Sequence, residues 1–466
     1  MKGHTTEIKL FNTLSGKKEA FKPLRAGHVG MYHCGPTVYD DAHIGNLRSY
    51  VFADILRRTF EYNGYSIDQI VNITDVGHLT SDADEGEDKM TKALKRLGKP
   101  LTLDAMRETA SVYEDHFKED LVLLDIETPS AFPRASDHIK DDIELIHTLE
   151  KNGYAYKISR GVCFDTSKFG TYGKLGNIKL DSLKDGARVS TDPEKRNQTD
   201  FWLWKFDDNL GWDSPWGRGF PGWHIECSAM SRKYLGQPFD IHTGGIDHIP
   251  VHHNNEIAQS EAAYGVPLAR YWIHNAFLTM NRSKMAKSAG GFVTLKTLVT
   301  NDLSPLAYRY WLLTGHYRSP MDFSYEAIKA AQNAYKRLQE AMAGYPEGGK
   351  VDAGFVGRFK ALINDDLDTP KALALAWELI KDAGVDDADK RATLLDFDRV
   401  FGLKLGSLPC PTDEVIPDNV RALADEREQA RQAKDWKKAD KLRGEIERLG
   451  YELRDAAGGA AIKKKV

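Results

Sequence analysis

The segment HVGMYHCGPTVYDDAHIGNLRSYVFADILRRTFEYNGYSIDQIVNITDVG, residues 28–77, decides the fold of the chain. Residues 28–35 form a short strand-like run that ends in Gly-Pro, and residues 66–77 return to strand character. Between them, residues 45–65 space apolar side chains along one helical face and stop at an Asn-Gly pair; those side chains are Leu47, Val51, Ile55 and Phe60. A strand, a helix and a strand at this spacing form a βαβ unit. The segment therefore predicts a parallel sheet with a right-handed crossover.

The rest of the first half continues this alternation around an interruption. The further elements expected are a helical stretch over residues 102–152, a hairpin over 155–165, and strands over 238–245 and 270–280. The chain is turn-rich up to about residue 215, which favours an insertion at about 125–215. We therefore expect an α/β domain over residues 1–290, with a Rossmann-like parallel sheet and this insertion.

Beyond residue 320 the sequence changes to alanine-rich amphipathic helices. Residues 324–344 and 369–384 are expected to be helical, the second with Thr369 as N-cap and Pro370 at the first helical position. They indicate a helical bundle over residues 321–405, which a connecting segment, 291–320, joins to the first domain.

The last part of the chain reads as a separate small unit. Residues 406–418 have the composition of a linker, and residues 419–466 are expected to form a mixed α/β unit. Its expected order is a helix to about Ala433, a break at Lys434-Asp435, a helix ending at Gly450, a short strand YELRD and a tail. Residues 421–466 carry 13 Lys/Arg against 9 Asp/Glu, a mild basic bias that many solvated helices share.

The bulk composition fits a cytosolic, multi-domain protein. A chain of 466 residues is too long for one core, so two to four domains are expected. No apolar run approaches the ~18 residues of a membrane span, and the start MKGHTTEIKLFN has no signal-peptide pattern. The four cysteines lie far apart, which implies no disulfide framework and fits a reducing compartment. A net charge of −4 argues against a broadly basic coat, so any polyanion would be bound locally.

Two short motifs indicate phosphate chemistry. The first, HIGN (His43, Gly45 and Asn46 with Ile44), lies where a strand gives way to a helix, whose N-terminus offers N–H groups to a phosphate. The second, NRSKMAKSAGGF (281–292), puts Lys284 and Lys287 in a polar loop that can close on a polyphosphate. Taken alone, the first is more often a capping turn and the second more often an ordinary surface loop. In this order, about 240 residues apart, they resemble the HIGH and KMSKS motifs of the class I aminoacyl-tRNA synthetases.

A possible metal site emerges from distant segments. Cys34 ends the first strand, Cys227 lies in PGWHIECSAMS (221–231), and His252 and Glu256 are four residues apart at the start of an expected helix. Strand ends converge at one edge of a parallel sheet, so these four side chains could form a zinc site with two sulfur, one nitrogen and one oxygen donor. His224 and His253 are rival ligands by spacing.

The chain resembles the cysteine–tRNA ligase family from about Leu10 to Asp455. The segments that carry the resemblance are CGPTVYDDAHIGN, NITD, PGWHIECSAM, HHNNEIAQSE, HYRSPMDFS and ARQAKDWKKADKLRGEIERLGYELRD. The resemblance implies one zinc ion held by Cys34, Cys227, His252 and Glu256, whereas Cys163 would pack in a hairpin and Cys410 lie in a linker. It also implies that residues 291–320 contact the tRNA stem and that residues 419–466 bind the anticodon.

The same resemblance assigns further roles. Trp223 would stack beside the substrate side chain, and Thr74 and Asp247 would hold the α-amino group of L-cysteine. Arg431, Asp440 and Asp455 would bind anticodon bases by hydrogen bonds, with Trp436 as a stacking platform. ATP with Mg²⁺, L-cysteine and cysteine tRNA are the expected substrates, and we expect a cytoplasmic monomer that binds no membrane.

The expected zinc has a chemical purpose. Serine differs from cysteine by one atom, and shape alone separates such substrates by only ~1–3 kcal/mol. A thiol of pKa ~8.5 loses its proton on coordination, whereas an alcohol hardly ionises, so zinc can select cysteine without an editing domain. The expected reaction is activation of cysteine by ATP, followed by attack of the 2′-hydroxyl of the terminal adenosine.

The sequence departs from the family pattern at three positions. Asn46 replaces the second histidine of HIGH, Ala286 replaces the middle serine of KMSKS, and Asn254 stands where a glutamate is frequent. Two alternatives are considered: a cysteine-activating amino-sugar ligase with the same core, and a non-catalytic zinc- or RNA-binding paralogue. Residues 421–455 argue against the first, and the intact lysine pair and ligands argue against the second.

Overall fold

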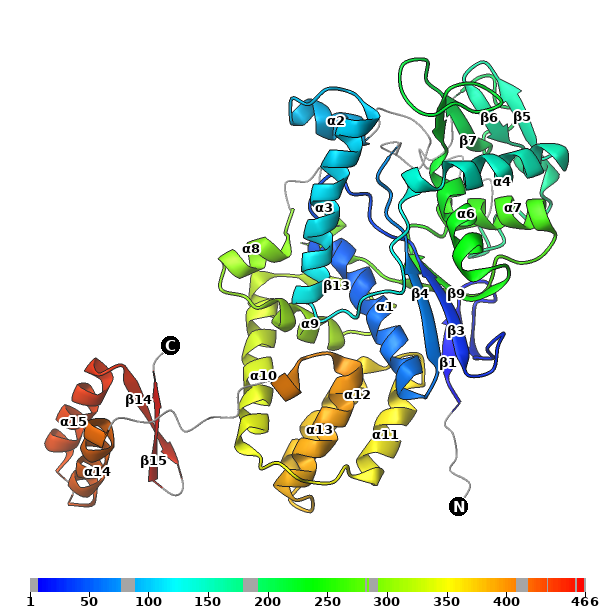
Figure 1. Cartoon of the computed structure of the whole chain (residues 1–466). Helices are drawn as coiled ribbons and strands as arrows, with labels where there is room; N and C mark the ends of the chain where they lie inside the picture. The colour runs from blue at the N-terminus through cyan, green and yellow to red at the C-terminus, as the bar shows by residue number, and fades with distance from the viewer. Residues whose placement is uncertain are drawn as a thin grey trace. The chain divides into compact units, whose positions relative to one another are not determined.

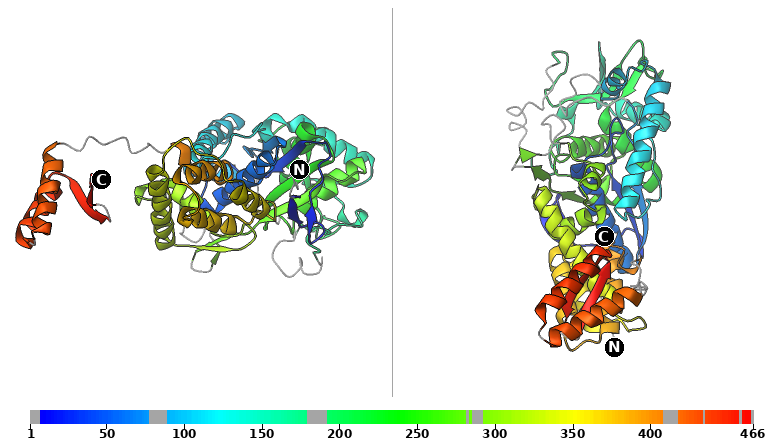
Figure 2. Two further views of the ribbon diagram at one scale, coloured as in Figure 1. Left: turned by 90° about the horizontal axis from the view of Figure 1, so that it is seen from below. Right: turned by 90° about the vertical axis from the view of Figure 1, so that its left-hand side faces the viewer.

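The computed structural model describes residues 7–76, 89–178, 192–280, 283–284, 292–407, 418–433, 435–456 and 459–464 (Figures 1 and 2). The chain divides into two compact units, Met1–Gly406 and Ser407–Val466. None of the helices in the described segments is long and apolar enough to cross a lipid bilayer.

The first unit is built around a four-stranded parallel sheet with the order β10-β9-β3-β4. Its strands are β3 (His28–His33), β4 (Ser66–Val71), β9 (Phe239–Gly245) and β10 (Ala269–Asn275). Helix α1 (Ile44–Tyr62) joins β3 to β4, so the predicted βαβ unit is confirmed. Because parallel strands end at one edge, the residues that follow β3, β9 and β10 gather there.

Helices cover both faces of this sheet, as Figure 1 shows. Successive side chains of a strand point to opposite faces, so Met31 packs with the α1 residues while Tyr32 packs with α6 (Trp223–Leu235) and α7 (His252–Tyr264). The predicted buried face of α1 is confirmed, because Leu47, Val51, Ile55 and Phe60 are all at most 7% exposed. The sheet edge above these layers is therefore held rigidly.

The insertion is a second, antiparallel sheet. Its strands, in the order β5-β6-β7-β8, are β5 (Ala155–Ile158), β6 (Gly161–Phe164), β7 (Phe201–Phe206) and β8 (Gly219–Pro221). The hairpin predicted over residues 155–165 is confirmed, and Cys163 is fully buried in it beside Trp202. The predicted turn-rich region up to residue 215 also contains a strand that was not predicted. The aromatic run FWLWKF forms β7 because its rings bury against the insertion core.

The helical stretch predicted over residues 102–152 is also interrupted. Helix α2 (Lys89–Arg96) is followed by α3 (Leu103–Leu123), and α4 (Ile139–Lys151) begins 16 residues after α3 ends. Asp125 has a φ of +54°, and Pro129 and Pro133 cannot continue a helix. The intervening segment instead runs beside the end of β4 through short parallel bridges.

The remaining elements of the first unit are short strands and the helical region. The strands are β1 (Lys9–Asn12), β2 (Lys17–Ala20), β11 (Leu278–Met280), β12 (Ser283–Lys284) and β13 (Met321–Phe323). The helices are α8 (Leu295–Thr300), α9 (Pro305–Leu313), α10 (Tyr325–Gly344), α11 (Ala353–Ile363), α12 (Thr369–Lys381) and α13 (Asp387–Phe401). The strand predicted over 270–280 is thus divided between β10 and β11.

The N-cap predicted for α12 is wrong by one residue. The side chain of Asp368 accepts a hydrogen bond from the backbone N–H of Lys371, so Asp368 caps the helix and Thr369 is its first residue. Both residue types cap well, and sequence alone does not separate neighbours in such a pair.

The second unit has two helices and a hairpin. They are α14 (Asp418–Gln432), α15 (Trp436–Arg448), β14 (Tyr451–Ala456) and β15 (Gly459–Lys464). The predicted helix–helix–strand order is confirmed, but the expected tail forms β15 and pairs with β14. Val420, Ala424 and Ile446 make a small core between the helices.

Candidate active site and metal-binding cluster

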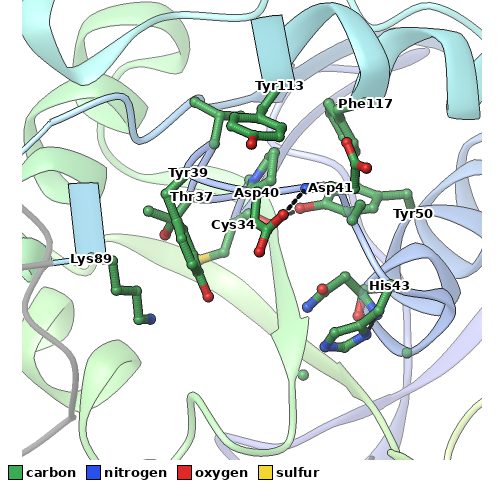
Figure 3. A pocket seen from close by; sticks show the side chains of 18 of the residues that line it. Cys34, Thr37, Tyr39, Asp40, Asp41, His43, Tyr50, Lys89, Tyr113 and Phe117 are labelled. Atoms are coloured by element: carbon green, nitrogen blue, oxygen red, sulfur yellow. Dashed lines mark hydrogen bonds between the residues drawn. The ribbon is translucent and has the colours of Figure 1, made fainter. Parts of the chain in front are cut away.

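A pocket of about 1020 Å³ opens at the carboxyl edge of the parallel sheet. Cys34 and Gly35 follow β3, Gly244 and Asp247 lie at the end of β9 and just beyond it, and Asn275 ends β10. Another wall comes from the start of α1 and a third from the α2–α3 pair, as Figure 3 shows in part. This is the edge at which α/β sheets bind ligands.

Cys34 is fixed by the glycine that follows it. The N–H of Gly35 donates to Asn72 Oδ1 at 2.8 Å. A Cβ at this position would lie 1.4 Å from the Asn72 carbonyl oxygen, so only glycine fits. The close approach holds Gly35, in the loop after β3, against Asn72, the residue after β4.

Four predicted ligands meet beside the pocket. The ligand atoms of Cys34, Cys227, His252 and Glu256 all lie within 4.8 Å of one another. Cys34 is half-buried and lines the pocket, whereas the other three are at most 2% exposed. This cluster of sulfur, nitrogen and oxygen donors could hold a metal ion.

The ionisation of Cys227 and Glu256 favours binding of a cation by the cluster. Hydrogen bonding from Cys34 lowers the pKa of Cys227 to about 6 against the opposing effect of burial, while burial raises the pKa of Cys34. Burial would raise the pKa of Glu256, but His242 and His252 hold it well below its usual range. The Nε2 atom of His252 lies 3.0 Å from Glu256 Oε1 yet makes no hydrogen bond in this geometry. A buried nitrogen aimed at a carboxylate and a thiolate without a hydrogen bond is suited to a metal ligand.

Of the two rival histidines, one lies behind the cluster. His224 Nδ1 is 2.8 Å from His252 Nδ1, on the side away from Glu256, so it can orient the His252 ring. The other, His253, belongs to a second possible set with Cys34, His242 and Glu256, whose atoms also lie within 4.8 Å of one another. The first set offers two sulfurs instead of one, which favours zinc.

His242 was not identified from the sequence. Its Nε2 lies 2.8 Å from Glu256 Oε2, and its ring stacks on Trp272 at 4.4 Å. A histidine inside a buried strand, as in PFDIHTGG, is the signal that could have drawn attention to it.

The predicted cysteine-binding residues are not all at the pocket. Trp223 and Asp247 line it, and the Trp223 ring lies 4.4 Å from that of His252. The buried hydroxyl of Thr74 instead donates to Glu226 Oε2 at 3.2 Å, and Thr37 forms the pocket wall beside it.

The α1 wall contains the first motif. His43 is the N-cap of α1, and its Nδ1 accepts from the backbone N–H of Asn46 at 3.0 Å. Gly45 and Asn46 also line the pocket, so the helix N-terminus faces it. Lys284 lies in β12, and its partner Lys287, like Ala286, falls outside the described residues.

The predicted anticodon residues lie in the second unit. Trp436 begins α15 and is 59% exposed, and Asp440 is exposed one turn along. Arg431 is half-buried in the last turn of α14, and Asp455 lies in β14. An exposed tryptophan at the start of a helix offers a ring face for stacking.

Two protein-family models match the chain. A class I (C) tRNA synthetase catalytic domain matches residues 20–333, and a cysteinyl-tRNA ligase anticodon-binding domain matches residues 413–461.

Curated proteins match over the full length. The chain is 50% identical to cysteine–tRNA ligase 1 of Burkholderia lata over 462 residues, which cover 98% of the chain and 96% of that protein. It is 44% identical to cysteine–tRNA ligase of Treponema denticola, with 98% and 99% covered. Among solved structures, Mycobacterium tuberculosis methionyl-tRNA synthetase in complex with methionyl-adenylate matches with a TM-score of 0.54 at 17% identity. That match covers 83% of the chain and 92% of the other, and it shows a shared fold.

Proposed function

The chain belongs to the cysteine–tRNA ligase family of class I aminoacyl-tRNA synthetases, and from this premise we propose that it joins L-cysteine to the 3′-terminal adenosine of cysteine tRNA with ATP. One observation carries the proposal. The ligand atoms of two cysteines, a histidine and a glutamate lie close together beside a pocket, and the N-terminus of a helix faces the same pocket. All the proposed groups belong to one chain, so the proposal requires only a monomer, working in the cytoplasm where translation occurs.

Cysteine binds at the cluster end of the pocket. Cys34, Cys227, His252 and Glu256 would hold one zinc ion, and zinc would favour the ionised thiol of cysteine over the hydroxyl of serine. The Trp223 ring packs beside the side chain of the bound cysteine, and the Asp247 carboxylate faces its α-ammonium group. Thr74 was also predicted to hold the α-ammonium group, and a hydroxyl that donates to Glu226 keeps an oxygen lone pair able to accept.

In the first step the cysteine carboxylate attacks the α-phosphorus of ATP. A new oxygen–phosphorus bond forms, the bond to pyrophosphate breaks, and pyrophosphate leaves with Mg²⁺. His43, Gly45 and Asn46 bring the positive end of α1 to the α-phosphate. Lys284 and Lys287 are proposed from the sequence to bind the departing phosphates.

In the second step the 2′-hydroxyl of the terminal adenosine attacks the carbonyl carbon of the adenylate. The ester bond forms and the bond to AMP breaks. The hydroxyl proton is transferred to a phosphate oxygen of the departing AMP or to water. Trp436, with Arg431, Asp440 and Asp455, would bind the anticodon on the second unit.

The two alternatives make different predictions. An amino-sugar ligase has no use for an anticodon-binding domain, and the match over residues 413–461 therefore supports the tRNA ligase. A non-catalytic paralogue would bind RNA without activating cysteine.

The test is cysteine-dependent exchange of pyrophosphate into ATP, repeated with serine and followed by transfer to cysteine tRNA. We expect exchange with cysteine, at least about 1000-fold less with serine, and charging of the tRNA. Exchange without transfer would favour the amino-sugar ligase, and no exchange with cysteine would refute the proposal.

A further inference from the structure

Asn254 departs from the family pattern, and neither of the two proposed steps uses it. It lies between the two cluster residues of α7, His252 and Glu256, and only 1% of its surface is exposed. Those two residues are four apart and share one face of the helix, whereas residue 254 is two positions from each and points elsewhere. A buried carboxamide on another side of the helix needs hydrogen-bond partners of its own.

Three backbone groups are the partners of this carboxamide. Its Nδ2 atom donates to the Leu175 carbonyl at 3.1 Å and to the Ile249 carbonyl at 2.6 Å. Its Oδ1 atom accepts from the Leu175 N–H at 3.1 Å. A primary amide can make all three bonds because it has two N–H donors and an acceptor, whereas a carboxylate only accepts. A glutamate, which is frequent at this position in the family, could not donate to either carbonyl.

The first of these backbone partners belongs to a run of turns, residues 171–178, which we call the strap. Two further side chains of the strap contact α7. The Tyr172 hydroxyl donates to Asn255 Oδ1, and Lys174 Nζ lies 2.6 Å from Glu261 Oε2. The strap is therefore attached to the helix over two of its turns.

The second backbone partner, the Ile249 carbonyl, lies in the loop between β9 and α7. This loop carries Asp247, which lines the pocket, and it enters the helix at Val251. The Val251 side chain makes no cap hydrogen bond, so the first turn of α7 has no side-chain N-cap. The hydrogen bond from Asn254 to Ile249 joins that turn to the loop.

We propose that Asn254 is a positioning residue for the selection of cysteine. Its carboxamide holds the first turn of α7, which presents His252, against both the strap and the loop that carries Asp247. The spacing between the metal-binding end and the ammonium-binding end of the pocket then depends on Asn254, which belongs to neither ligand set and is not among the described residues that line the pocket. The inference rests on the proposed function, in which one cysteine molecule spans both ends.

The test uses Asn254→Leu in the full-length protein, because leucine has nearly the shape of asparagine but no polar atom. Asn152→Leu is the matched control, since Asn152 Nδ2 donates at 3.0 Å to the carbonyls of Ala262 and Ala263 near the other end of α7. We expect the dissociation constant for zinc, measured by competition with a chelator, to rise about tenfold or more in Asn254→Leu. In Asn152→Leu it should change by less than about twofold.

A second measurement separates positioning from a general loss of stability. In the exchange reaction at saturating zinc, KM for cysteine should rise about tenfold in Asn254→Leu. KM for ATP should change by less than about twofold, because α1 and not α7 forms the proposed phosphate site. If Asn254→Leu does not fold, Asn254→Ser, which is smaller and uncharged, takes its place in both measurements.

The outcomes separate the inference from the proposed function. A zinc affinity of Asn254→Leu equal to that of the unmodified protein or of Asn152→Leu would overturn the inference, as would a parallel rise of both KM values. Absence of exchange in the unmodified protein would instead refute the proposed function, and the zinc measurement would still decide whether Asn254 positions the metal ligands.

Discussion

At the scale of single residues, the proposed selection of cysteine depends on the four side chains of the metal-binding cluster. Cys34 and Glu256 are 222 residues apart in sequence, yet their ligand atoms share one cluster. Replacing Cys227 by serine removes a sulfur donor from a buried site and leaves a weakly coordinating hydroxyl. We expect zinc affinity to fall more than about 100-fold and the preference for cysteine over serine to decline with it.

Metal content, measured on the purified protein, checks this directly. Cys163→Ser is the control, because Cys163 is fully buried in the β5–β6 hairpin and belongs to neither possible ligand set. A stoichiometric zinc content in Cys227→Ser would show that the other set, with His242 and His253, holds the ion.

Residue chemistry could be predicted from the sequence only in part. The i, i+4 spacing of His252 and Glu256 is local, so the pair was predictable. That Cys34 and Cys227 join them was implied by resemblance, because no periodicity links residues on different elements. His242 was missed because a buried histidine in a strand is common in ordinary structure.

At the scale of elements, one buried side chain links three helices. Arg309 of α9 is completely buried, donates to Asp54 of α1 at 2.5 Å, and donates to the Phe401 carbonyl at the end of α13 at 2.6 Å. Gly402 lies against it with a φ of +62°, and an added Cβ would lie 2.4 Å from the guanidinium. The helix that presents His43 is therefore fastened to the helical region.

Arg309→Leu should lower the free energy of unfolding of the first unit by about 3–5 kcal/mol, because it leaves a buried carboxylate and carbonyl short of donors. Denaturant unfolding followed by circular dichroism measures the change. Arg337→Leu, at an exposed position of α10, should change stability by less than about 0.5 kcal/mol. Equal stability of the two variants would mean that the buried network contributes nothing.

Elements with strong local periodicity were predicted, and those without a clear local pattern were not. The 3.6-residue pattern of α1 and the alternation around β5 and β6 are complete within their own segments. By contrast, β7 pairs with β6 across a long intervening segment. The partner of β15 is the preceding strand β14, but the glycine- and lysine-rich composition of its segment hid the strand signal.

At the scale of the whole molecule, the chain combines two separately packed units. Removing the second unit by ending the chain after Gly406 should leave cysteine-dependent exchange within about threefold. It should lower kcat/KM for tRNA charging by about 100-fold, because stacked bases contribute about 1–3 kcal/mol each. Trp436→Ala in the full chain should cause a smaller loss, about tenfold. Steady-state charging assays measure both, and undiminished charging by the shortened chain would contradict the anticodon assignment.

The contact between Gly35 and Asn72 limits how the specificity of this enzyme can be redesigned. The backbone of Gly35, next to the ligand Cys34, packs directly against Asn72, and no residue larger than glycine fits there. An engineer who wishes to admit a bulkier amino acid, or to exchange the ion, has no freedom on that side. The adjustable ligands are those presented by α6 and α7, so a library aimed at new substrates should vary those helices and leave the glycine alone.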